Sequence, residues 1–314
     1  MKAYFLEAKG GATVLDSREV PMPQPAAGQL LVKVRAAGLN RGEFIAGHGL
    51  VAPGAAKPAG QEAAGEVVGS GERVMGRASG AFAEYALMER REALPIPAHL
   101  SFEQAACIPL AFMVVHDMLI AQGALAPGDW LLVTGVSSGV GVAALQAAKA
   151  LGASVIGTSG SAGKLERLQP LGLDVGIPTR KDDFQARVMQ ATGGKGVQLA
   201  VNTVGGSLFA ECLRSLAFEG RLAVVGYVDG RLTAEVDLDA VHARRLRIFG
   251  VSNKLRDAEQ RAATVRGFTR DLLPLFEQRR IEPLIDRVFA FGELAAAKRH
   301  MEADRHAGKI VLRI

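Results

Sequence analysis

The chain has 314 residues, of which 49% are hydrophobic and 22% are charged, and its formal net charge is +5. This is the composition of an ordinary globular protein, and the length allows one large or two medium domains. The positive charges are dispersed along the sequence and no nucleic-acid-binding motif is present, so a nucleic-acid partner is not expected.

Neither a membrane segment nor a cysteine-based site is indicated. The sequence contains no uninterrupted apolar stretch long enough to span a bilayer, and its first residues lack the apolar core of a signal peptide. The two cysteines, Cys107 and Cys212, form no CxxC motif, so we expect two buried free thiols and no structural zinc. These features favour a soluble, cytoplasmic protein.

The first hundred residues predict a β-rich domain. Segment 29–38 (QLLVKVRAAG) alternates apolar and polar residues, segment 65–76 (GEVVGSGERVMG) predicts two short strands joined by a Ser-Gly turn, and segment 82–88 is a further strand candidate. Proline and glycine interrupt the sequence between these segments. Many short strands between turn signals are typical of a barrel-like β domain.

From Ser101, a candidate helix cap, the pattern changes to alternating strands and helices. Strands are expected at 129–135, 153–159, 174–177, 197–204, 221–228 and 246–252. Helices are expected at 140–152, 162–172, 183–194, 207–217, 257–280 and 293–304, and a last strand at 308–314. Such alternation predicts an α/β fold with a doubly wound parallel sheet. We therefore expect a β-rich domain of residues 1–112 and 253–314, interrupted by an α/β domain at 113–252.

A glycine-rich stretch, VTGVSSGVG (133–141), joins a predicted strand to a predicted helix. Gly135 allows a sharp turn, Gly139 allows the backbone to approach a pyrophosphate, and Gly141 allows the helix to pack closely on the strand. Free N–H groups at the start of the helix then bind the phosphates. The predicted dinucleotide-binding residues here are Ser138, Gly139, Val140 and Gly141.

The next strand predicts which dinucleotide is bound. An NAD-binding site places Asp or Glu near its end to bind the ribose hydroxyls. Here the sequence is GTSGSAGK (157–164), and the first acidic residue after the turn is Glu166, inside the next helix. Hydroxyl, amide and ammonium groups suit a 2′-phosphate instead, which predicts NADPH as the cofactor. The residues concerned are Thr158, Ser159, Gly160 and Lys164.

TGVSSGVG also matches the TGxxxGxG motif of short-chain dehydrogenases. Those enzymes need a Tyr-x-x-x-Lys pair to protonate the carbonyl oxygen. None of the three tyrosines, Tyr4, Tyr85 and Tyr227, is followed by lysine four positions later, and the motif lies in mid-chain. Short-chain chemistry is therefore not expected.

The whole chain resembles the medium-chain dehydrogenase/reductase superfamily, specifically its zinc-free quinone oxidoreductase (zeta-crystallin-like) branch. Stretches that carry the resemblance include VKVRAAGLNRGEF (32–44), PAGQEAAGEVVG (58–69), LAPGDWLLVTGVSSGVGVAALQAAKALGASVIGT (125–158) and AGKIVL (307–312). The resemblance implies a GroES-like β domain interrupted by a Rossmann domain. It also implies NADPH-dependent hydride transfer to a small-molecule quinone or α,β-unsaturated carbonyl compound.

Zinc-dependent members of this superfamily bind a catalytic zinc through a Cys after the early strand and the His of a Gly-His-Glu. The corresponding stretches here, 38–40 and 60–62, contain neither residue. The resemblance therefore implies an enzyme without metal, since the ligands of the zinc are missing. An NAD-linked alcohol dehydrogenase is a third hypothesis, and it would require metal and bind NADH more tightly.

The resemblance also assigns site residues. Asn40 matches the family's Asn beside the nicotinamide and is the candidate catalytic residue. A family Asn-Tyr pair near the 2′-phosphate is replaced by Pro178 and Thr179, and Arg180 follows as a substitute for the Tyr. The other matches to cofactor-binding positions are Asn202 and Val204 near the adenine ribose, Gly226 and Tyr227 beside the nicotinamide, and Ser252 and Asn253 where the chain returns to the first domain.

Two departures from the family pattern keep a second hypothesis open. Many relatives have Tyr where this chain has Val51, and Thr where it has Val114. The alternative is therefore a catalytically weak NADPH-binding protein, like the lens crystallins of this family. His48 and His116 are the remaining polar residues there, and surface or hydrogen-bonded histidines are the simpler interpretation. The family also implies a homodimer joined through the edge strand near 246–252.

Overall fold

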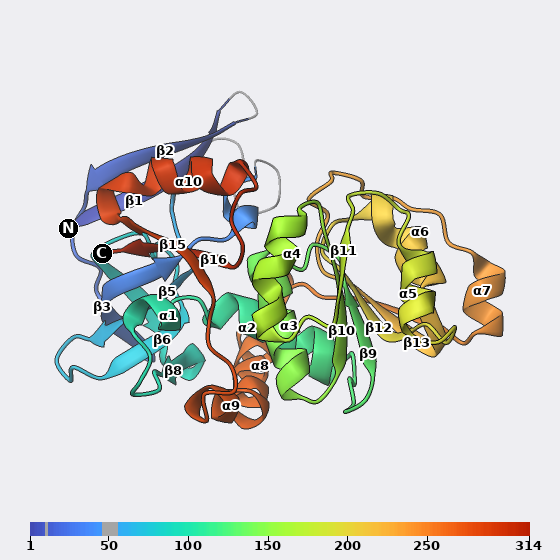
Figure 1. Ribbon diagram of the computed structural model, residues 1–314. Helices are drawn as coiled ribbons and strands as arrows, with labels where there is room; N and C mark the ends of the chain where they lie inside the picture. Colours follow the sequence, from blue (N-terminus) through green and yellow to red (C-terminus); the bar gives the residue numbers. More distant parts are fainter. Residues whose placement is uncertain (10–11, 46–55) are drawn as a thin grey trace. The chain divides into compact units, whose positions relative to one another are not determined.

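The computed structural model describes residues 1–9, 12–45 and 56–314, which divide into two compact units (Figure 1). The β-rich unit comprises Met1–Met113, Arg256–Thr269 and Glu282–Ile314, and the α/β unit comprises Val114–Leu255 and Arg270–Ile281. The fold class is α/β with a separate β-rich domain, as the sequence predicts. The expected domain limits differ from this division at residues 270–281, which group with the α/β unit.

The described residues of the β-rich unit form two sheets. In the larger one, the seven strands follow the order β15 (Ile285–Ala290), β16 (Lys309–Arg313), β3 (Gln29–Gly38), β5 (Glu62–Val67), β6 (Arg73–Arg77) and β8 (Ala93–Pro95), with β7 (Tyr85–Glu89) also paired to β3. The strand predicted at 29–38 and the two within 65–76 are confirmed. The smaller sheet contains β2 (Ala12–Glu19), β1 (Lys2–Lys9) and β4 (Lys57–Pro58).

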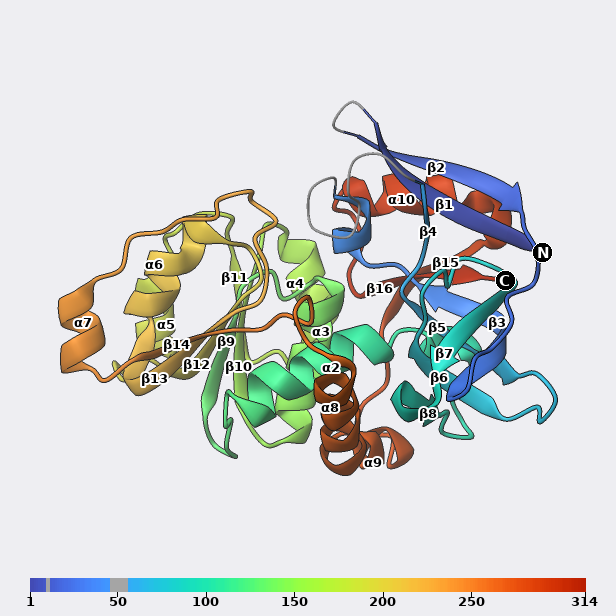
Figure 2. The ribbon, with the colours of Figure 1, turned by 180° about the vertical axis from the view of Figure 1, so that it is seen from behind.

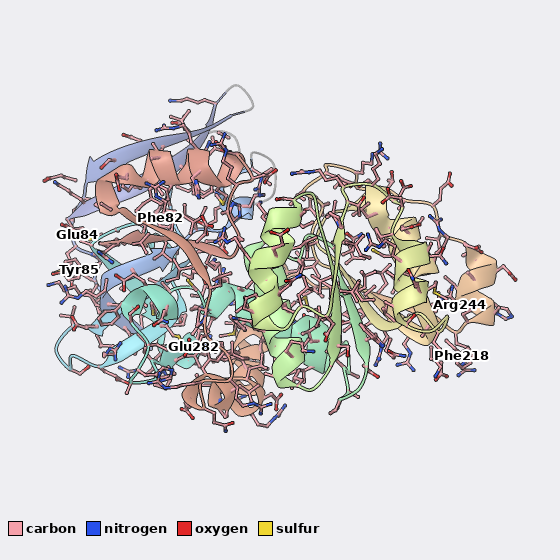
Figure 3. The ribbon with its side chains drawn as sticks, in the orientation of Figure 1. Phe82, Glu84, Tyr85, Phe218, Arg244 and Glu282 are labelled. Carbon is pink, nitrogen blue, oxygen red and sulfur yellow. The ribbon has the colours of Figure 1, made fainter. Side chains whose placement is uncertain are left out.

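The core of this unit lies on the sheet built around β3. Alternate residues of β3 are buried, among them Val32 and Val34, and they pack with Phe82, which is fully buried (Figure 3). Four further helices complete the unit: α1 (Phe102–Ala105), α2 (Pro109–Val115), α8 (Ala258–Asp271) and α10 (Leu294–Glu302). Ser101 caps α1 by accepting a hydrogen bond from the Gln104 N–H, which confirms the predicted helix start.

The α/β unit contains a six-stranded parallel sheet within the described chain. Its order is β11 (Val175–Pro178), β10 (Ser154–Ser159), β9 (Trp130–Val133), β12 (Val197–Asn202), β13 (Leu216–Val224) and β14 (Arg247–Gly250). The strand order reverses at β9, and the crevice at the carboxyl ends of strands beside such a switch point is the usual ligand site of this architecture.

Helices cover both faces of this sheet, as Figures 1 and 2 show. On one face lie α3 (Gly139–Ala150) and α4 (Ala162–Leu168), and on the other α5 (Gln185–Ala191) and α6 (Gly206–Arg214). Because both faces are covered, the central strands are apolar along their length: Leu131, Leu132 and Val133 of β9 are fully buried. Two shorter helices, α7 (Leu238–Ala243) and α9 (Leu273–Glu277), complete the unit.

Two predicted helices are wrong in their extent. The helix expected to Ala217 ends at Arg214, because the Ser215 hydroxyl donates to the Glu211 carbonyl and Leu216 already pairs with β12. The continuous helix expected at 257–280 is divided into α8 and α9. Pro274 lies in the first turn of α9, where its missing N–H is tolerated but where it cannot continue a preceding helix. Among the described residues, no helix has the length and hydrophobicity needed to cross a membrane.

Candidate functional site

The glycine-rich turn lies at the carboxyl end of β9, directly before α3. The Ser138 hydroxyl caps α3 by accepting a hydrogen bond from the Gly141 N–H at 3.0 Å. A Cβ atom on Gly141 would lie 2.5 Å from the Gly135 carbonyl oxygen, so only glycine allows the helix to approach the turn this closely. The first N–H groups of a helix have no partner within it. With the Gly141 N–H bonded, those of Gly139 and Val140 remain for a phosphate.

The turn is held against the end of the neighbouring strand β10. The Val136 N–H donates to the Thr158 carbonyl at 3.0 Å, and the Gly135 N–H donates to the Thr158 hydroxyl at 3.3 Å. The hydroxyls of Ser137 and Ser159 are 3.2 Å apart and hydrogen-bonded. Thr158 and Ser159 are both buried. Their side chains therefore support the turn, and the groups that follow them in sequence are better placed to meet a ligand.

Beyond β10, a small residue and two cations define the predicted 2′-phosphate site. Ser161 caps α4 by accepting from the Lys164 N–H at 3.4 Å, which places Lys164 in the first turn of that helix. The Arg180 side chain covers Gly160 so closely that a Cβ atom there would collide with the Arg180 Nε. Arg180 comes from the segment after β11, the strand next to β10. The structure thus brings Arg180 to the backbone that the sequence assigned to the 2′-phosphate.

Thr179 has a local role in the structure. Its hydroxyl donates to the Asp183 carboxylate at 2.6 Å and accepts from the Lys181 N–H at 3.0 Å. These bonds fix the loop that carries Arg180. The predicted contact of Thr179 with the cofactor remains a prediction.

Asn202 ends β12 and organises the turn after it. Its Oδ1 accepts hydrogen bonds from the N–H groups of Val204 and Gly205, each at 3.0 Å, and its Nδ2 donates to the Gly205 carbonyl at 2.8 Å. Asn202 is fully buried. Its side chain therefore builds the loop at the edge of the sheet, where Val204 is half-buried, and the predicted ribose contact of these two residues stays untested.

The remaining cofactor candidates follow the last two strands of the sheet. Gly226 lies after β13, where a Cβ atom would be 3.0 Å from the Thr203 carbonyl oxygen, and Tyr227 is 41% exposed. Ser252 and Asn253 follow β14, and the Ser252 hydroxyl accepts from the Lys254 N–H. Because all strands are parallel, these residues share the carboxyl edge of the sheet with the glycine-rich turn.

Asn40 belongs to a hydrogen-bonded polar cluster in the β-rich unit, which we call the Asn40 cluster: Asn40, Glu43, Glu62 and Lys309. The Asn40 Nδ2 donates to Glu43 Oε1 at 3.0 Å and to Glu62 Oε1 at 2.9 Å. The Lys309 ammonium donates to Asn40 Oδ1 at 2.8 Å, to Glu62 Oε1 at 2.6 Å and to the Leu39 carbonyl at 3.0 Å.

Sheet register brings the Asn40 cluster together. Strand β3 lies between β16 and β5, with Val311 opposite Gly38 and Ala63 opposite Ala37. Lys309 and Glu62, the first residues of β16 and β5, therefore flank the end of β3, and Asn40 follows two residues beyond it. A Cβ atom on Gly38 would lie 2.5 Å from Glu62 Oε1, so the close approach of the Glu62 carboxylate requires glycine there.

Burial controls the charges in the cluster. Glu43, Glu62 and Lys309 are 2%, 0% and 6% exposed. Desolvation, reinforced by the nearby Glu62 carboxylate, raises the pKa of Glu43 from 4.5 to about 8, although the Asn40 amide and the Lys309 ammonium act in the opposite direction. At neutral pH the cluster therefore holds a neutral Glu43 beside the Glu62–Lys309 ion pair. Sequence reasoning did not select Glu43, Glu62 or Lys309 as functional residues.

Comparison with known proteins identifies the family. A model of the zinc-binding dehydrogenases matches residues 139–265. The spectinabilin polyketide synthase system protein NorB of Streptomyces orinoci is 34% identical over 320 residues, which cover 96% of this chain and 14% of that protein. The chain also resembles the mycobacterial protein Rv1454c complexed with NADPH, with 27% identity, a TM-score of 0.89 and full coverage of both chains. For the quinone oxidoreductase of Thermus thermophilus, also solved with NADPH, the values are 28% and 0.84, again with full coverage.

The chain belongs to the medium-chain dehydrogenase/reductase superfamily. It is placed in the quinone oxidoreductase-like branch, which confirms the resemblance seen in the sequence. The glycine-rich turn is accordingly the dinucleotide-binding turn of this superfamily and not that of short-chain dehydrogenases. The chain spans only 14% of the length of NorB, so the activity of that longer protein is not transferred to it.

The positions of the zinc ligands in zinc-dependent members of the superfamily lie in and beside the Asn40 cluster. Among the described residues there is no group of three or more His, Cys, Asp and Glu side chains arranged to hold a metal ion. The Lys309 ammonium supplies a positive charge to this cluster. Zinc-independence of the reaction remains a prediction.

The polar residues that stood out at the family's variable positions fall in different places. His116 is buried and its Nε2 is 2.8 Å from the Asp271 carboxylate, both within the α/β unit, so it is a hydrogen-bonded histidine. Val114 is half-buried. His48 and Val51 lie outside the described residues.

Proposed function

We propose that this protein is a zinc-independent, NADPH-dependent reductase of activated carbon–carbon double bonds in quinones or α,β-unsaturated carbonyl compounds. The observation that carries the proposal is the end of β10, where Gly160 is covered by Arg180 and followed by Lys164. No carboxylate stands there to repel a 2′-phosphate, and two cations are available to bind it. NADPH as the cofactor is supported by the similar structures that contain it.

The residues present fit a dinucleotide. The N–H groups of Gly139 and Val140 offer donors for the pyrophosphate, and the close approach of α3 to the turn depends on the missing side chain of Gly141. The bound cofactor would supply a hydride to the electrophilic carbon of the substrate, while a proton is added to complete the reduction. The protein's contribution is to position the two reactants and to exclude water from them.

Asn40 is proposed to bind the nicotinamide end of the cofactor, as the superfamily resemblance implies. It is half-buried, whereas the other members of the Asn40 cluster are buried. It is thus the member of the cluster whose side chain a ligand can reach. Its hydrogen bonds hold its orientation before the ligand arrives, which is the condition for precise positioning.

A catalytically weak NADPH-binding protein is the second candidate. Val114 offers no hydroxyl group at the position where many relatives of the superfamily have threonine. A substrate oxygen that gathers negative charge needs hydrogen-bond donors, and a valine side chain provides none.

The two candidates are separated by a direct assay. Purified protein is mixed with NADPH and a panel of quinones, enones, 2-alkenals and α,β-unsaturated thioesters, and oxidation of the cofactor is followed by absorbance. Thioesters are included because NorB is a polyketide synthase system protein. Turnover of one substrate class, unchanged by a metal chelator, is expected. Binding of NADPH with no turnover of any compound would favour the second candidate, and turnover of alcohols with NAD that chelators abolish would contradict the proposal.

We also propose that the protein forms a homodimer through the edge of the six-stranded sheet. Strand β14 pairs only with β13 among the described residues, so one edge of it has unpaired backbone groups. Exposed apolar side chains lie on the same part of the unit: Phe218 (Figure 3) is 64% exposed and Ile248, on β14, is 41% exposed. Pairing with a second copy would cover both features.

A further inference from the structure

The polarity of the Asn40 side chain is determined by its neighbours. A terminal amide is nearly symmetric in shape, so its oxygen and nitrogen are distinguished by their hydrogen-bond partners. The Nδ2 atom faces two carboxyl oxygens, of Glu43 and Glu62, which accept hydrogen bonds. The Oδ1 atom faces the Lys309 ammonium, which can only donate. Turning the amide over would place oxygen against oxygen and N–H against ammonium, so this arrangement has one orientation.

The hydrogen-bonding capacity of the cluster is almost completely used. An ammonium has three N–H donors, and those of Lys309 go to Asn40, Glu62 and the Leu39 carbonyl. Glu62 Oε1 accepts from Asn40 and Lys309, and its Oε2 accepts from the Leu110 N–H at 2.8 Å. Both N–H groups of the Asn40 amide are also taken.

Two acceptor positions remain within the described part of the chain. One is the second lone pair of Asn40 Oδ1, on a half-buried residue. The other is Glu43 Oε2, which is buried and has no hydrogen-bond partner. A ligand that reaches this cluster without displacing it therefore meets the Asn40 oxygen, and the group it presents must be a hydrogen-bond donor.

We propose that Lys309, Glu62 and Glu43 are positioning residues that fix the Asn40 amide as a hydrogen-bond acceptor, and that its ligand is the N–H of a primary carboxamide. This inference rests on the proposed function, in which that carboxamide is the one on the nicotinamide ring. The hydrogen bond would orient the ring and thereby select the face from which the hydride leaves. A cofactor whose ring substituent cannot donate a hydrogen bond should be used poorly.

The charges of the cluster agree with this role. The groups that face Asn40 are Glu43 from the turn after β3, Glu62 from β5 and Lys309 from β16. Burial keeps the Glu43 carboxyl protonated at neutral pH, since its pKa is raised to about 8. With Oε1 accepting from Asn40, its proton belongs on Oε2, and Glu62 and Lys309 balance one another in charge. Ligand binding therefore does not require any proton to enter or leave the cluster.

The test compares NADPH with its 3-acetylpyridine analogue, whose acetyl group has no N–H. The wild type is expected to prefer NADPH in kcat/KM by about tenfold, the value of one well-placed hydrogen bond. Asn40→Ala is expected to abolish the preference. The paired variant Lys309→Met with Glu62→Gln keeps the cluster neutral but removes the groups that fix the amide, and it is expected to reduce the preference to about twofold. Lys298→Met, in the exposed pair with Glu302, is the matched control.

A second measurement separates a positioning defect from a folding defect. The fragment of NADP that contains the 2′-phosphate, the adenine and both riboses but no nicotinamide should bind all four proteins equally. A wild type that uses both cofactors equally, or an Asn40→Ala variant that keeps the preference, would overturn the inference while leaving the proposed function intact. A wild type that binds neither cofactor would overturn both. A paired variant that still binds the fragment and retains the full preference would show that the cluster does not orient Asn40.

Discussion

Replacing Glu43 with glutamine is expected to stabilise the protein at neutral and mildly alkaline pH. Glu43 is 2% exposed, and burial is the main reason that its pKa is raised from 4.5 to about 8. In the unfolded chain the carboxyl group ionises at its ordinary value, whereas in the folded protein it keeps its proton over this range. A glutamine has the same shape, accepts the same hydrogen bond from Asn40 and never has to ionise.

The magnitude follows from proton linkage. Between pH 4.5 and about 8 the folded state binds more protons at Glu43 than the unfolded state does, so the free energy of unfolding falls as the pH rises. Each pH unit corresponds to about 1.4 kcal/mol, which gives a total loss of roughly 3 to 5 kcal/mol across the window. Below this window the contribution of Glu43 to the pH dependence disappears, and above it the loss is complete and constant.

Urea unfolding of the wild type and Glu43→Gln at several pH values measures this effect. The difference in unfolding free energy should grow in favour of the variant by roughly 1 kcal/mol per pH unit inside the window. Glu302→Gln, at an exposed position, controls for the loss of a carboxyl group as such. A Glu43→Gln variant that is less stable than the wild type by the same amount at every pH would mean that Glu43 is an ionised partner of Lys309, which would refute the reasoning.

Three further outcomes are expected. Gly141→Ala should lower stability by about 1 to 3 kcal/mol and abolish NADPH binding in calorimetry, because its Cβ would lie 2.5 Å from a carbonyl oxygen. Gly163→Ala, where nothing lies within 4 Å, is the control that should retain both. Lys164→Ala and Arg180→Ala should each weaken NADPH binding about tenfold or more with little effect on NADH, and equal losses for both cofactors would contradict the 2′-phosphate assignment. Ile248→Lys on the exposed edge strand should convert a dimer to a monomer in light scattering, whereas an unchanged mass would place the interface elsewhere.

The α/β unit was largely predictable because its signals are local. Apolar runs such as 129–135 and the glycine-rich turn after them are determined by neighbours in sequence, and the capping bond from Ser138 uses a residue three positions away. The boundary between α6 and β13 was less accessible. Leu216 could equally extend a helix, and its pairing with Val197 depends on a different strand.

The Asn40 cluster was not predictable in the same way. Lys309 and Glu62 are 247 positions apart, and their contact depends on both strands pairing with β3 in a particular register. Neither residue carries a motif that distinguishes it from an ordinary surface charge. Strand β15 was missed for a related reason, since it pairs only with β16 in the described chain and its residues Asp286 and Arg287 interrupt the apolar pattern. Such features depend on tertiary context and not on local sequence preference.

The long sequence separation between Lys309 and its partners has a consequence for biosynthesis. On the ribosome, Asn40, Glu43 and Glu62 emerge long before the lysine that completes their hydrogen bonds. Until β16 joins β3, the Glu62 carboxylate lacks its only ammonium partner in the cluster, and burying it alone would be unfavourable. The early strands therefore have an electrostatic reason to remain hydrated and open while the α/β unit is synthesised. The unit that begins first is thus expected to close second.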